Sequence, residues 1–288
     1  MSTLPGQLAN LFKLRIGITI AFTAVVGLMV TPGPAPSAWQ VVALVFAVMG
    51  ASASAGGFNQ YIERDLDARM HRTRQRPFVT GALAPSHTWL WLIAVLQIVS
   101  VGLAAVVLNP VAALYVFLGA FFYAVVYTLW LKPRTSMNIV IGGLAGSFAV
   151  LAGAAAVDPG LSPLPLLLAA VLFLWTPSHF WSLAIALHEE YATAGVPMLP
   201  CVVGDRVTAW IILGNTLLLV AVSLLPVYYG LLGPIYLSGA LIGGGWFLVR
   251  NLQLVRNPCP QLGRLNFYAS LLHLSLVLMT AMVDMYWR

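Results

Sequence analysis

Long apolar stretches separated by short polar turns dominate this chain of 288 residues. A stretch of roughly 20 apolar residues is long enough for a helix to cross a bilayer. Its backbone polar groups must be satisfied within the segment, which favours helices, and the alternation typical of a membrane β-barrel strand is absent. The pattern therefore predicts an all-α, polytopic membrane protein that is a bundle of nine transmembrane helices. The predicted helices cover residues 16–30, 38–57, 88–108, 111–130, 138–157, 164–187, 208–228, 235–250 and 266–286.

The breaks between these stretches are rich in proline and glycine, as expected for turns. No polar stretch is long enough for a soluble domain of typical size. We therefore expect residues 1–288 to form a single membrane domain. Lys13 and Arg15 precede the first apolar run as in a signal peptide, but eight further predicted spans follow and no clear cleavage site is present.

Composition excludes several classes of protein. Hydrophobic residues make up 60% of the chain and charged residues only 8%, whereas a soluble protein averages about 45–50% and about 25%. An ordinary soluble enzyme, a disordered chain and a free-standing nucleic-acid binder are thereby excluded, and we expect no nucleic-acid partner despite the net charge of +6. Two cysteines without a pairing motif indicate neither a disulfide framework nor a structural zinc site.

The few positive charges are distributed unevenly. With nine helices, the N-terminus and the loops after the second, fourth, sixth and eighth helices share one side of the membrane. That side collects thirteen of the fourteen lysines and arginines, and only Arg288 lies on the other. Cytoplasmic loops carry an excess of lysine and arginine. The sequence therefore predicts a cytoplasmic N-terminus and a C-terminus outside.

Six of the eight acidic residues lie on the same side as the cations. One group follows the second predicted helix and another follows the sixth. Carboxylates near a bilayer are costly and are often functional. The two groups can meet across the mouth of a helical bundle, although acids that merely accompany arginines as solvated pairs are the simpler alternative. The residues concerned are Glu63, Asp65, Asp67, Glu189, Glu190 and Asp205.

The first acidic group has helical spacing. Asn59, Glu63 and Asp67 follow one another at intervals of four, so they share a face if the helix continues through them. Arg72 and Arg76 come one turn apart just downstream. Mg²⁺ is held by few carboxylates and shares its other positions with water and substrate phosphates, and guanidinium groups bind phosphate oxygens. This pattern indicates an active site for a diphosphate and its Mg²⁺ cofactor.

These residues resemble a known family. The spacing Asn59-x3-Glu63-x3-Asp67 resembles the first acidic motif of the UbiA-type intramembrane prenyltransferases. The longer string 59–77, with the strings 138–143, 176–181 and 194–200, resembles the branch of protohaem IX farnesyltransferases. The resemblance covers nearly the whole chain, and the strings are too long for chance agreement.

The resemblance implies transfer of farnesyl from farnesyl diphosphate to a vinyl group of haem b, with addition of water, giving haem O and diphosphate. It implies Mg²⁺-assisted ionisation to an allylic cation and a lipid-accessible central cavity. It also implies an integral protein of the bacterial cell membrane, or of the mitochondrial inner membrane, with a cytoplasmic active site. A haem A synthase or a terminal oxidase assembly would receive the product.

Carried over residue by residue, the resemblance gives three groups of site residues. Where the branch has two aspartates in the second motif, this chain has glutamates, which lengthens the arm that reaches the metal. Lys132, Arg134 and Lys13 could contact the diphosphate or simply follow the charge rule. The catalytic candidates are Asn59, Glu63, Asp67, Glu189 and Glu190. The metal candidates are the four carboxylates of that group: Glu63, Asp67, Glu189 and Glu190. The diphosphate candidates are Arg72, Arg76, Lys132, Arg134 and Lys13.

A further group falls within the predicted spans, where a haem or prenyl pocket would lie. His179 either packs as a buried hydrogen-bonding residue or faces the haem, because imidazole can ligate iron or move protons. The aromatic members either line a pocket or belong to the interfacial belt. The candidates are His179, Tyr127, Asn138, Phe180 and Trp181.

Three other functions fit parts of the sequence. A UbiA-type enzyme acting on an aromatic acceptor, such as a quinone or chlorophyll precursor, would share the metal chemistry, but the strings at 176–181 and 194–200 argue against it. Residues 65–69 faintly resemble the motif of membrane CDP-alcohol phosphotransferases, whose downstream part is missing. A transporter would need polar groups near the bilayer midplane or broken helices in repeated halves, whereas these acids lie at one mouth.

Overall fold

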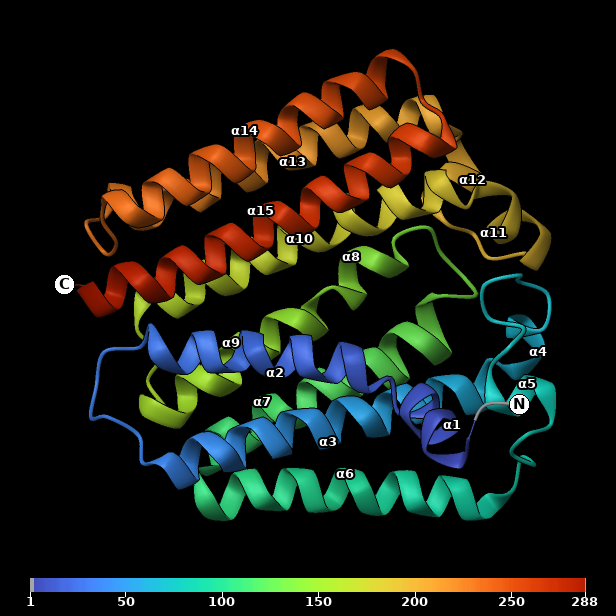
Figure 1. Ribbon diagram of the computed structural model, residues 1–288, viewed down its shortest axis with the longest axis horizontal. Coiled ribbons are helices and arrows are strands. Elements are labelled where there is room, and N and C mark those ends of the chain that lie inside the picture. The colour runs from blue at the N-terminus through green and yellow to red at the C-terminus, as the bar shows by residue number, and fades with distance from the viewer. Residues whose placement is uncertain (1–2, 288) are drawn as a thin grey trace.

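The computed structural model describes residues 3–287, and these form helices without any strand (Figure 1). Seven of its helical spans are individually long and apolar enough to cross a membrane, and a bent pair at the start brings the number to eight. A ninth long helix, α14 (Pro234–Arg256), packs between α13 and α15 but is less apolar. The all-α, polytopic prediction is confirmed, and the number nine holds approximately. The other long helices are α3 (Ala38–Ile62), α6 (His87–Val107), α10 (Pro163–Ala186), α13 (Asp205–Tyr228) and α15 (Pro260–Trp287).

Three of the predicted spans are irregular. The first consists of α1 (Leu4–Leu11) and α2 (Leu14–Met29), which are bent by 48°. The fourth begins as α7 (Pro110–Phe121) and continues as the π-helix η1 (Phe122–Leu131). The fifth is divided at Gly143 into α8 (Asn138–Gly142) and α9 (Leu144–Val157). All three irregularities lie toward the same end of the bundle (Figure 1).

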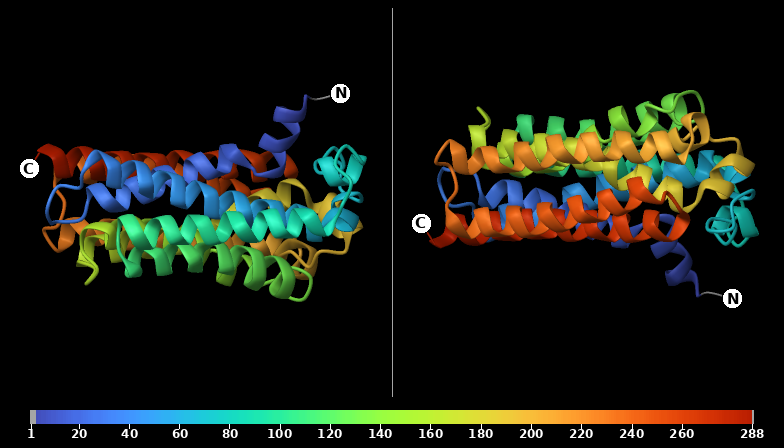
Figure 2. Two further views of the ribbon diagram at one scale, coloured as in Figure 1. Left: turned by 90° about the horizontal axis from the view of Figure 1, so that it is seen from below. Right: turned by 90° about the horizontal axis from the view of Figure 1, so that it is seen from above.

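Short helices gather at that end as well. α4 (Arg64–Asp67), α5 (Pro77–Thr80), α11 (His188–Ala194) and α12 (Leu199–Val203) connect long helices there, and the C-terminal end of α15 lies at the opposite end (Figures 1 and 2). The thirteen cations of the predicted cytoplasmic side all belong to this end, in its loops or in the adjoining turns of the long helices. Arg288, the one cation expected on the other side, lies outside the described residues. We call this end the polar end.

Glycines allow two of the long helices to approach backbone to backbone. A Cβ atom added at Gly27 of α2 would collide with the carbonyl of Val150 in α9, and one added at Gly153 would collide with the carbonyl of Ala24. Small residues permit this close approach in membranes, where helix association depends on packing because the lipid is as apolar as the side chains. The α2–α9 crossing therefore forms a rigid seam in the middle of the bundle.

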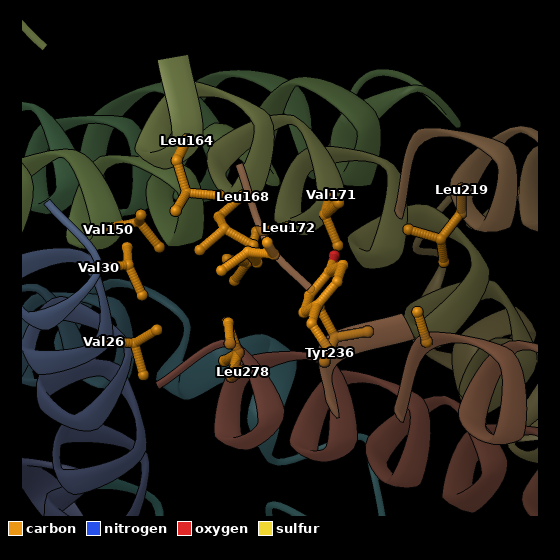
Figure 3. Packing of buried hydrophobic residues seen from close by; sticks show 14 of the residues in the cluster. Val26, Val30, Val150, Leu164, Leu168, Val171, Leu172, Leu219, Tyr236 and Leu278 are labelled. Carbon is orange, nitrogen blue, oxygen red and sulfur yellow. The ribbon is translucent and has the colours of Figure 1, made fainter. Parts of the chain in front are cut away.

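Apolar side chains fill the space on one side of this seam. They come from α2, α9, α10, α13, α14 and α15 and form one buried cluster, whose members from α2 and α9 point toward those from α10 and α15 (Figure 3). A second cluster joins α2 and α9 to α3, α6 and α7 on the other side. The labelled members of the first cluster are Val26, Val30, Val150, Leu164, Leu168, Val171, Leu172, Leu219, Tyr236 and Leu278.

A buried carboxylate organises the end opposite the polar end. Asp284 of α15 is 2% exposed and accepts hydrogen bonds from the backbone N–H groups of Gly233, Ile235 and Tyr236 at 2.6, 3.1 and 3.2 Å. These donors belong to the unsatisfied first turn of α14, where a negative charge is favourable. This acidic residue therefore has a structural role.

Candidate active site

The two acidic loops meet at the polar end, as the sequence predicts. The backbone N–H of Arg72, in the loop after α4, donates to Glu190 Oε2 of α11 at 3.3 Å. The guanidinium of Arg72 lies 3.4 Å from the hydroxyl of the buried Tyr191. These residues are 118 and 119 positions apart in the sequence. The loop after α3 and the loop after α10 thus form one polar surface.

The residues of the first acidic motif line up even though their helix is interrupted. α3 ends at Ile62, and Glu63 is its C-cap. The helical hydrogen-bond pattern nevertheless continues, because Glu63 N donates to Asn59 O and Asp67 N donates to Glu63 O, at 2.9 and 2.7 Å. Asn59, Glu63 and Asp67 are 2%, 6% and 2% exposed. The expected shared face therefore exists, and it is buried.

Each carboxylate of this motif is neutralised by a cation from elsewhere in the chain. Lys132 Nζ, just beyond η1, donates to both carboxylate oxygens of Glu63 at 2.6 and 2.7 Å. Arg76 Nη1 donates to Asp67 Oδ2 at 2.6 Å. Burial raises the pKa of the Asp67 carboxyl above its usual range, and the charge of Arg76 opposes that shift. Two buried ion pairs thus stand side by side in the first motif.

Asn59 belongs to a closed ring of hydrogen bonds. Lys13 Nζ donates to Asn59 Oδ1 at 2.6 Å and to the hydroxyl of Tyr123 at 2.8 Å. Asn59 Nδ2 donates to Thr128 Oγ1 at 3.1 Å, and Thr128 Oγ1 donates to the carbonyl of Tyr123 at 2.9 Å. The ring joins the α1–α2 bend, the end of α3 and the π-helix. Lys13 therefore lies at the site that the sequence assigned to it.

The π-helix explains how one segment supplies Tyr123, Thr128 and Lys132 to the same site. Tyr123 and Lys132 are nine residues apart, which is about two and a half turns of an α-helix and would put them on opposite faces. The i→i−5 bonding of η1, seen in the bond from Lys132 N to Tyr127 O at 2.9 Å, gives wider turns. Nine residues then make close to two turns. Tyr123 and Thr128 are site residues that the α-helical reading of the sequence missed.

The structure does not bring every candidate to this cluster. Arg134 is exposed, and its guanidinium donates to the carbonyls of Leu129 and Trp130 at the end of η1, both at 2.8 Å. Glu189 is exposed in the first turn of α11. Tyr127 does lie at the cluster, with its ring 5.8 Å from Lys132 Nζ and stacked on Tyr123.

His179 lies deeper in the bundle, on α10. Its ring is stacked between Trp175 and Phe267 with centroid distances of 4.1 and 4.2 Å. Its Nδ1 is 2.7 Å from the hydroxyl of Ser270, which itself donates to the carbonyl of Phe267 at 2.6 Å. Because the Ser270 proton is used in that bond, Nδ1 carries the imidazole proton and Nε2 holds the lone pair. Trp175, Phe267 and Ser270 had no distinguishing pattern in the sequence.

The other pocket candidates differ in their surroundings. Phe180 is half-buried and packs edge-on against His179 at 4.9 Å. Trp181 is 4% exposed and Asn138 is fully buried. Neither the indole N–H nor the two amide atoms have a hydrogen-bond partner within residues 3–287. A groove of about 390 Å³ lies between α3, α6 and α7–η1, but none of these candidates lines it. The central cavity stays a prediction.

The donor set of the polar end is compatible with Mg²⁺. No three Asp, Glu, His or Cys side chains of residues 3–287 lie close enough to enclose a metal by themselves. Mg²⁺ does not require this, because one or two carboxylates plus water and phosphate oxygens complete its shell. Glu63 and Asp67 are buried carboxylates already compensated by positive charge, and Glu190 is joined to the same surface.

The helical fold and the paired charges at one end define an intramembrane protein with a polar, charged cluster at one end of its bundle. The chain belongs to the UbiA prenyltransferase family, whose model matches residues 20–277. It is 54% identical over 277 residues to a Paramagnetospirillum magneticum protein named protoheme IX farnesyltransferase 2, with 96% of each chain covered. A second protein of that organism, protoheme IX farnesyltransferase 1, is 47% identical, with 98% and 99% covered.

Solved structures show the same fold at low sequence identity. The structure reported for digeranylgeranylglyceryl phosphate synthase matches with a TM-score of 0.80 at 18% identity, covering 98% of this chain and 99% of that one. A UbiA homolog from Archaeoglobus fulgidus bound to DMAPP and Mg²⁺ matches with a TM-score of 0.70 at 16% identity, covering 96% and 99%. The expected family and fold are thus confirmed, and the chain is an integral membrane protein.

Proposed function

We propose that this chain transfers the farnesyl group of farnesyl diphosphate to a vinyl group of haem b, with addition of water, to give haem O and diphosphate. The observation that carries the proposal is the contact between Arg72 and Glu190, which joins two acidic loops into one charged surface. The names of the relatives that are 54% and 47% identical support haem b as the acceptor.

Glu63 and Asp67 would hold Mg²⁺ together with Glu190 from the facing loop, and the exposed Glu189 would join them by turning toward the metal. When bound, Mg²⁺ supplies positive charge that stabilises the leaving diphosphate. Lys132 and Arg76, each 2.6 Å from one of these carboxylates, would then donate to diphosphate oxygens instead. Lys13 and Arg72 would contribute two further cationic donors. The site thus exchanges internal ion pairs for contacts with the metal and the substrate.

The allylic cation left by diphosphate departure must be kept from water until the vinyl group attacks. Tyr127 lies beside the carboxylates, and its aromatic face can stabilise a passing cation. Phe180 and Trp181 follow His179 directly in α10, and Phe180 packs edge-on against the His179 ring. His179 presents an unprotonated Nε2, which suits contact with haem iron. We propose that the prenyl chain and the haem lie along this part of α10.

The sidedness of the charges supports a cytoplasmic polar end, with the C-terminus outside. We also propose that the whole chain acts as one domain and passes haem O to a haem A synthase or a terminal oxidase assembly. A reporter fused to the C-terminus tests the orientation. Activity of the reporter in the cytoplasm would contradict it.

Mass spectrometry of haems from cells that make this protein tests the function. We expect haem O with the unchanged chain and little with Asp67→Ala. Asp65→Ala is the matched control, because Asp65 is an exposed acidic residue of the same short helix; it should leave haem O unchanged. Equal haem O from Asp67→Ala would remove the proposed role of Asp67. If the purified protein prenylates an aromatic acid but not haem b, the proposed acceptor becomes the aromatic acid.

A further inference from the structure

Lys13 has an unusual backbone conformation. It lies at the bend between α1 and α2 with φ 48° and ψ 43°, in the left-handed region. Among the described residues, only Lys13 and Leu161 have a positive φ without being glycine. A lysine in this conformation is unfavourable, and such residues persist where the surrounding structure holds them and often where function requires it. The surroundings of Lys13 show what holds it.

Gln60 fixes the backbone on the N-terminal side of the bend. Its Nε2 donates to the carbonyl oxygens of Asn10 and Leu11 at 2.7 and 3.3 Å. These carbonyls belong to the last turn of α1, where Asn10 O also accepts from the backbone N–H of Lys13 at 3.1 Å. Gln60 is 1% exposed and follows Asn59 directly in α3. Neighbouring residues of α3 therefore hold the backbone before Lys13 and the amine at the end of its side chain.

Gly56 makes room for the side chain between these two anchors. A Cβ atom at this position would lie 3.2 Å from Lys13 Cδ and 3.4 Å from its Cβ and Cγ. The methylene chain of Lys13 therefore runs over the backbone of α3 at Gly56. A larger residue would push the stem of Lys13 away from the path that leads to Asn59 and Tyr123. Glycine otherwise weakens a helix interior.

The charge that this arrangement places at the site is not balanced. Lys132 and Arg76 are paired with Glu63 and Asp67, whereas Lys13 forms no ion pair within residues 3–287 and is bonded to neutral groups. With the Lys13 amine protonated, three cations face two carboxylates and leave one positive charge. A buried cation without an anion is costly. A ligand with several negative charges, such as a diphosphate, would supply the missing anion.

We infer that Gly56 and Gln60 are positioning residues, which act through Lys13 to place its amine for the diphosphate of the substrate. The inference rests on the proposed function. Neither residue contacts the diphosphate in this arrangement. Gln60 holds the left-handed bend, Gly56 opens the path of the side chain, and Asn59 and Tyr123 orient the amine before substrate arrives. The binding site therefore has its surplus charge in place in advance, at a cost in backbone strain.

Calorimetric titration of the detergent-purified full chain with inorganic diphosphate and Mg²⁺ tests the inference. Lys13→Met should weaken binding by about tenfold to hundredfold, the effect of one charged hydrogen bond. Gly56→Ala and Gln60→Met should also weaken it, but should add nothing in the Lys13→Met background. Gly57→Ala is the matched control: the nearest atoms to its Cβ would be side-chain atoms of Ile93 and Phe12, at 3.4 Å, and it should bind as the unchanged chain does.

Thermal unfolding separates positioning from a structural role. Gly56→Ala should unfold at the same or a higher temperature, because alanine favours a helix more than glycine does, while its diphosphate affinity falls. Wild-type affinity in both Gly56→Ala and Gln60→Met, or losses that add to that of Lys13→Met, would overturn the inference and leave the proposed function standing. An unchanged chain that does not bind diphosphate would overturn both.

Discussion

Lys132 and Glu63 lie 69 positions apart, and the lysine amine contacts both oxygens of the carboxylate at 2.6 and 2.7 Å. The two side chains are 13% and 6% exposed. A pair this buried is not strong evidence for stability, because desolvation offsets the attraction between its charges. Its position beside a second ion pair fits the proposed function, in which Lys132 would release Glu63 to a metal ion and donate to a diphosphate.

Removal of Lys132 should therefore destabilise the empty protein more than the loaded one. Lys132→Met leaves Glu63 buried without its cation, which costs about 3–5 kcal/mol. We expect a clearly lower unfolding temperature in the absence of metal and a partial recovery when Mg²⁺ and inorganic diphosphate are added. Thermal unfolding with and without these additions measures both effects.

The double variant Lys132→Met with Glu63→Gln is the control for this prediction. It removes both charges, so its stability without metal should exceed that of Lys132→Met alone. Its activity should stay low, because the cation for the diphosphate is still missing. An equal loss of stability in the single variant with and without Mg²⁺ would contradict the exchange of partners.

The helices themselves were largely predictable from the sequence, because apolar length and the charge rule act on each segment separately. The irregular backbone was not. Apolar runs do not distinguish an α-helix from a π-helix. The sequence of residues 122–131 therefore did not predict that Tyr123 and Lys132 would share a face. The bend at Lys13 was equally hidden, since the residues that contact it, Gly56 and Gln60, lie on another helix.

The π-helix itself can be tested by shortening it. Deletion of Val125, a partly exposed residue of η1, should allow α-helical bonding to return. Lys132 would then turn about a quarter of a turn away from Tyr123 and lose its contact with Glu63. We expect kcat/KM to fall at least about tenfold, the loss of one charged hydrogen bond. Steady-state kinetics of the purified protein measure it.

Val125→Ala is the control for the deletion, because it keeps the chain length and should keep the activity. Size-exclusion chromatography and circular dichroism establish that the shortened chain is folded and helical. A folded deletion variant with wild-type kinetics would show that the wider turns of η1 do not matter for the site.

Substitution of His179 should affect the binding and reaction of haem b and leave the affinity for diphosphate unchanged. It lies seven residues before the end of α10, or about 10 Å along the helix from the polar end. His179→Ala should reduce haem O formation and change the absorption spectrum of bound haem b, while diphosphate affinity stays at the wild-type value. Ser270→Ala should act in the same direction but more weakly, because it only frees the ring to change tautomer.

His273 offers a matched control on α15. It is fully buried, and neither of its ring nitrogens has a hydrogen-bond partner in the part of the chain that the structure describes. His273→Leu should keep haem O formation, and it should not lower the unfolding temperature because no hydrogen bond is lost. Full haem O formation by His179→Ala would show that His179 is only a packing residue.

The candidate site was predicted less completely than the fold. Residue types and spacing singled out the carboxylates as candidates, because acids are rare in this chain and cluster in two loops. They did not identify the partners, which come from distant segments: Tyr123 and Thr128 reach Asn59, and Ser270 reaches His179. Arg134 was a candidate that the structure does not bring to the cluster. It lies at the polar end, but its guanidinium donates to carbonyls at the end of its own helix.

The activity should depend on the negative charge of Glu190 as well as on the contact that Glu190 makes between the loops. Glu190→Gln keeps an oxygen that can accept the Arg72 N–H, so the loops stay joined, but it removes the negative charge. Glu190→Ala removes both. If Glu190 holds Mg²⁺, both variants should lose most of their activity, and higher Mg²⁺ concentrations should restore Glu190→Gln more than Glu190→Ala.

Initial rates over a series of Mg²⁺ concentrations test this prediction. Asp205→Asn is a control in the same region, because Asp205 is paired with His188 at 2.7 Å. Wild-type rates for Glu190→Gln at all Mg²⁺ concentrations would reduce Glu190 to a contact between loops and leave the metal to Glu63 and Asp67.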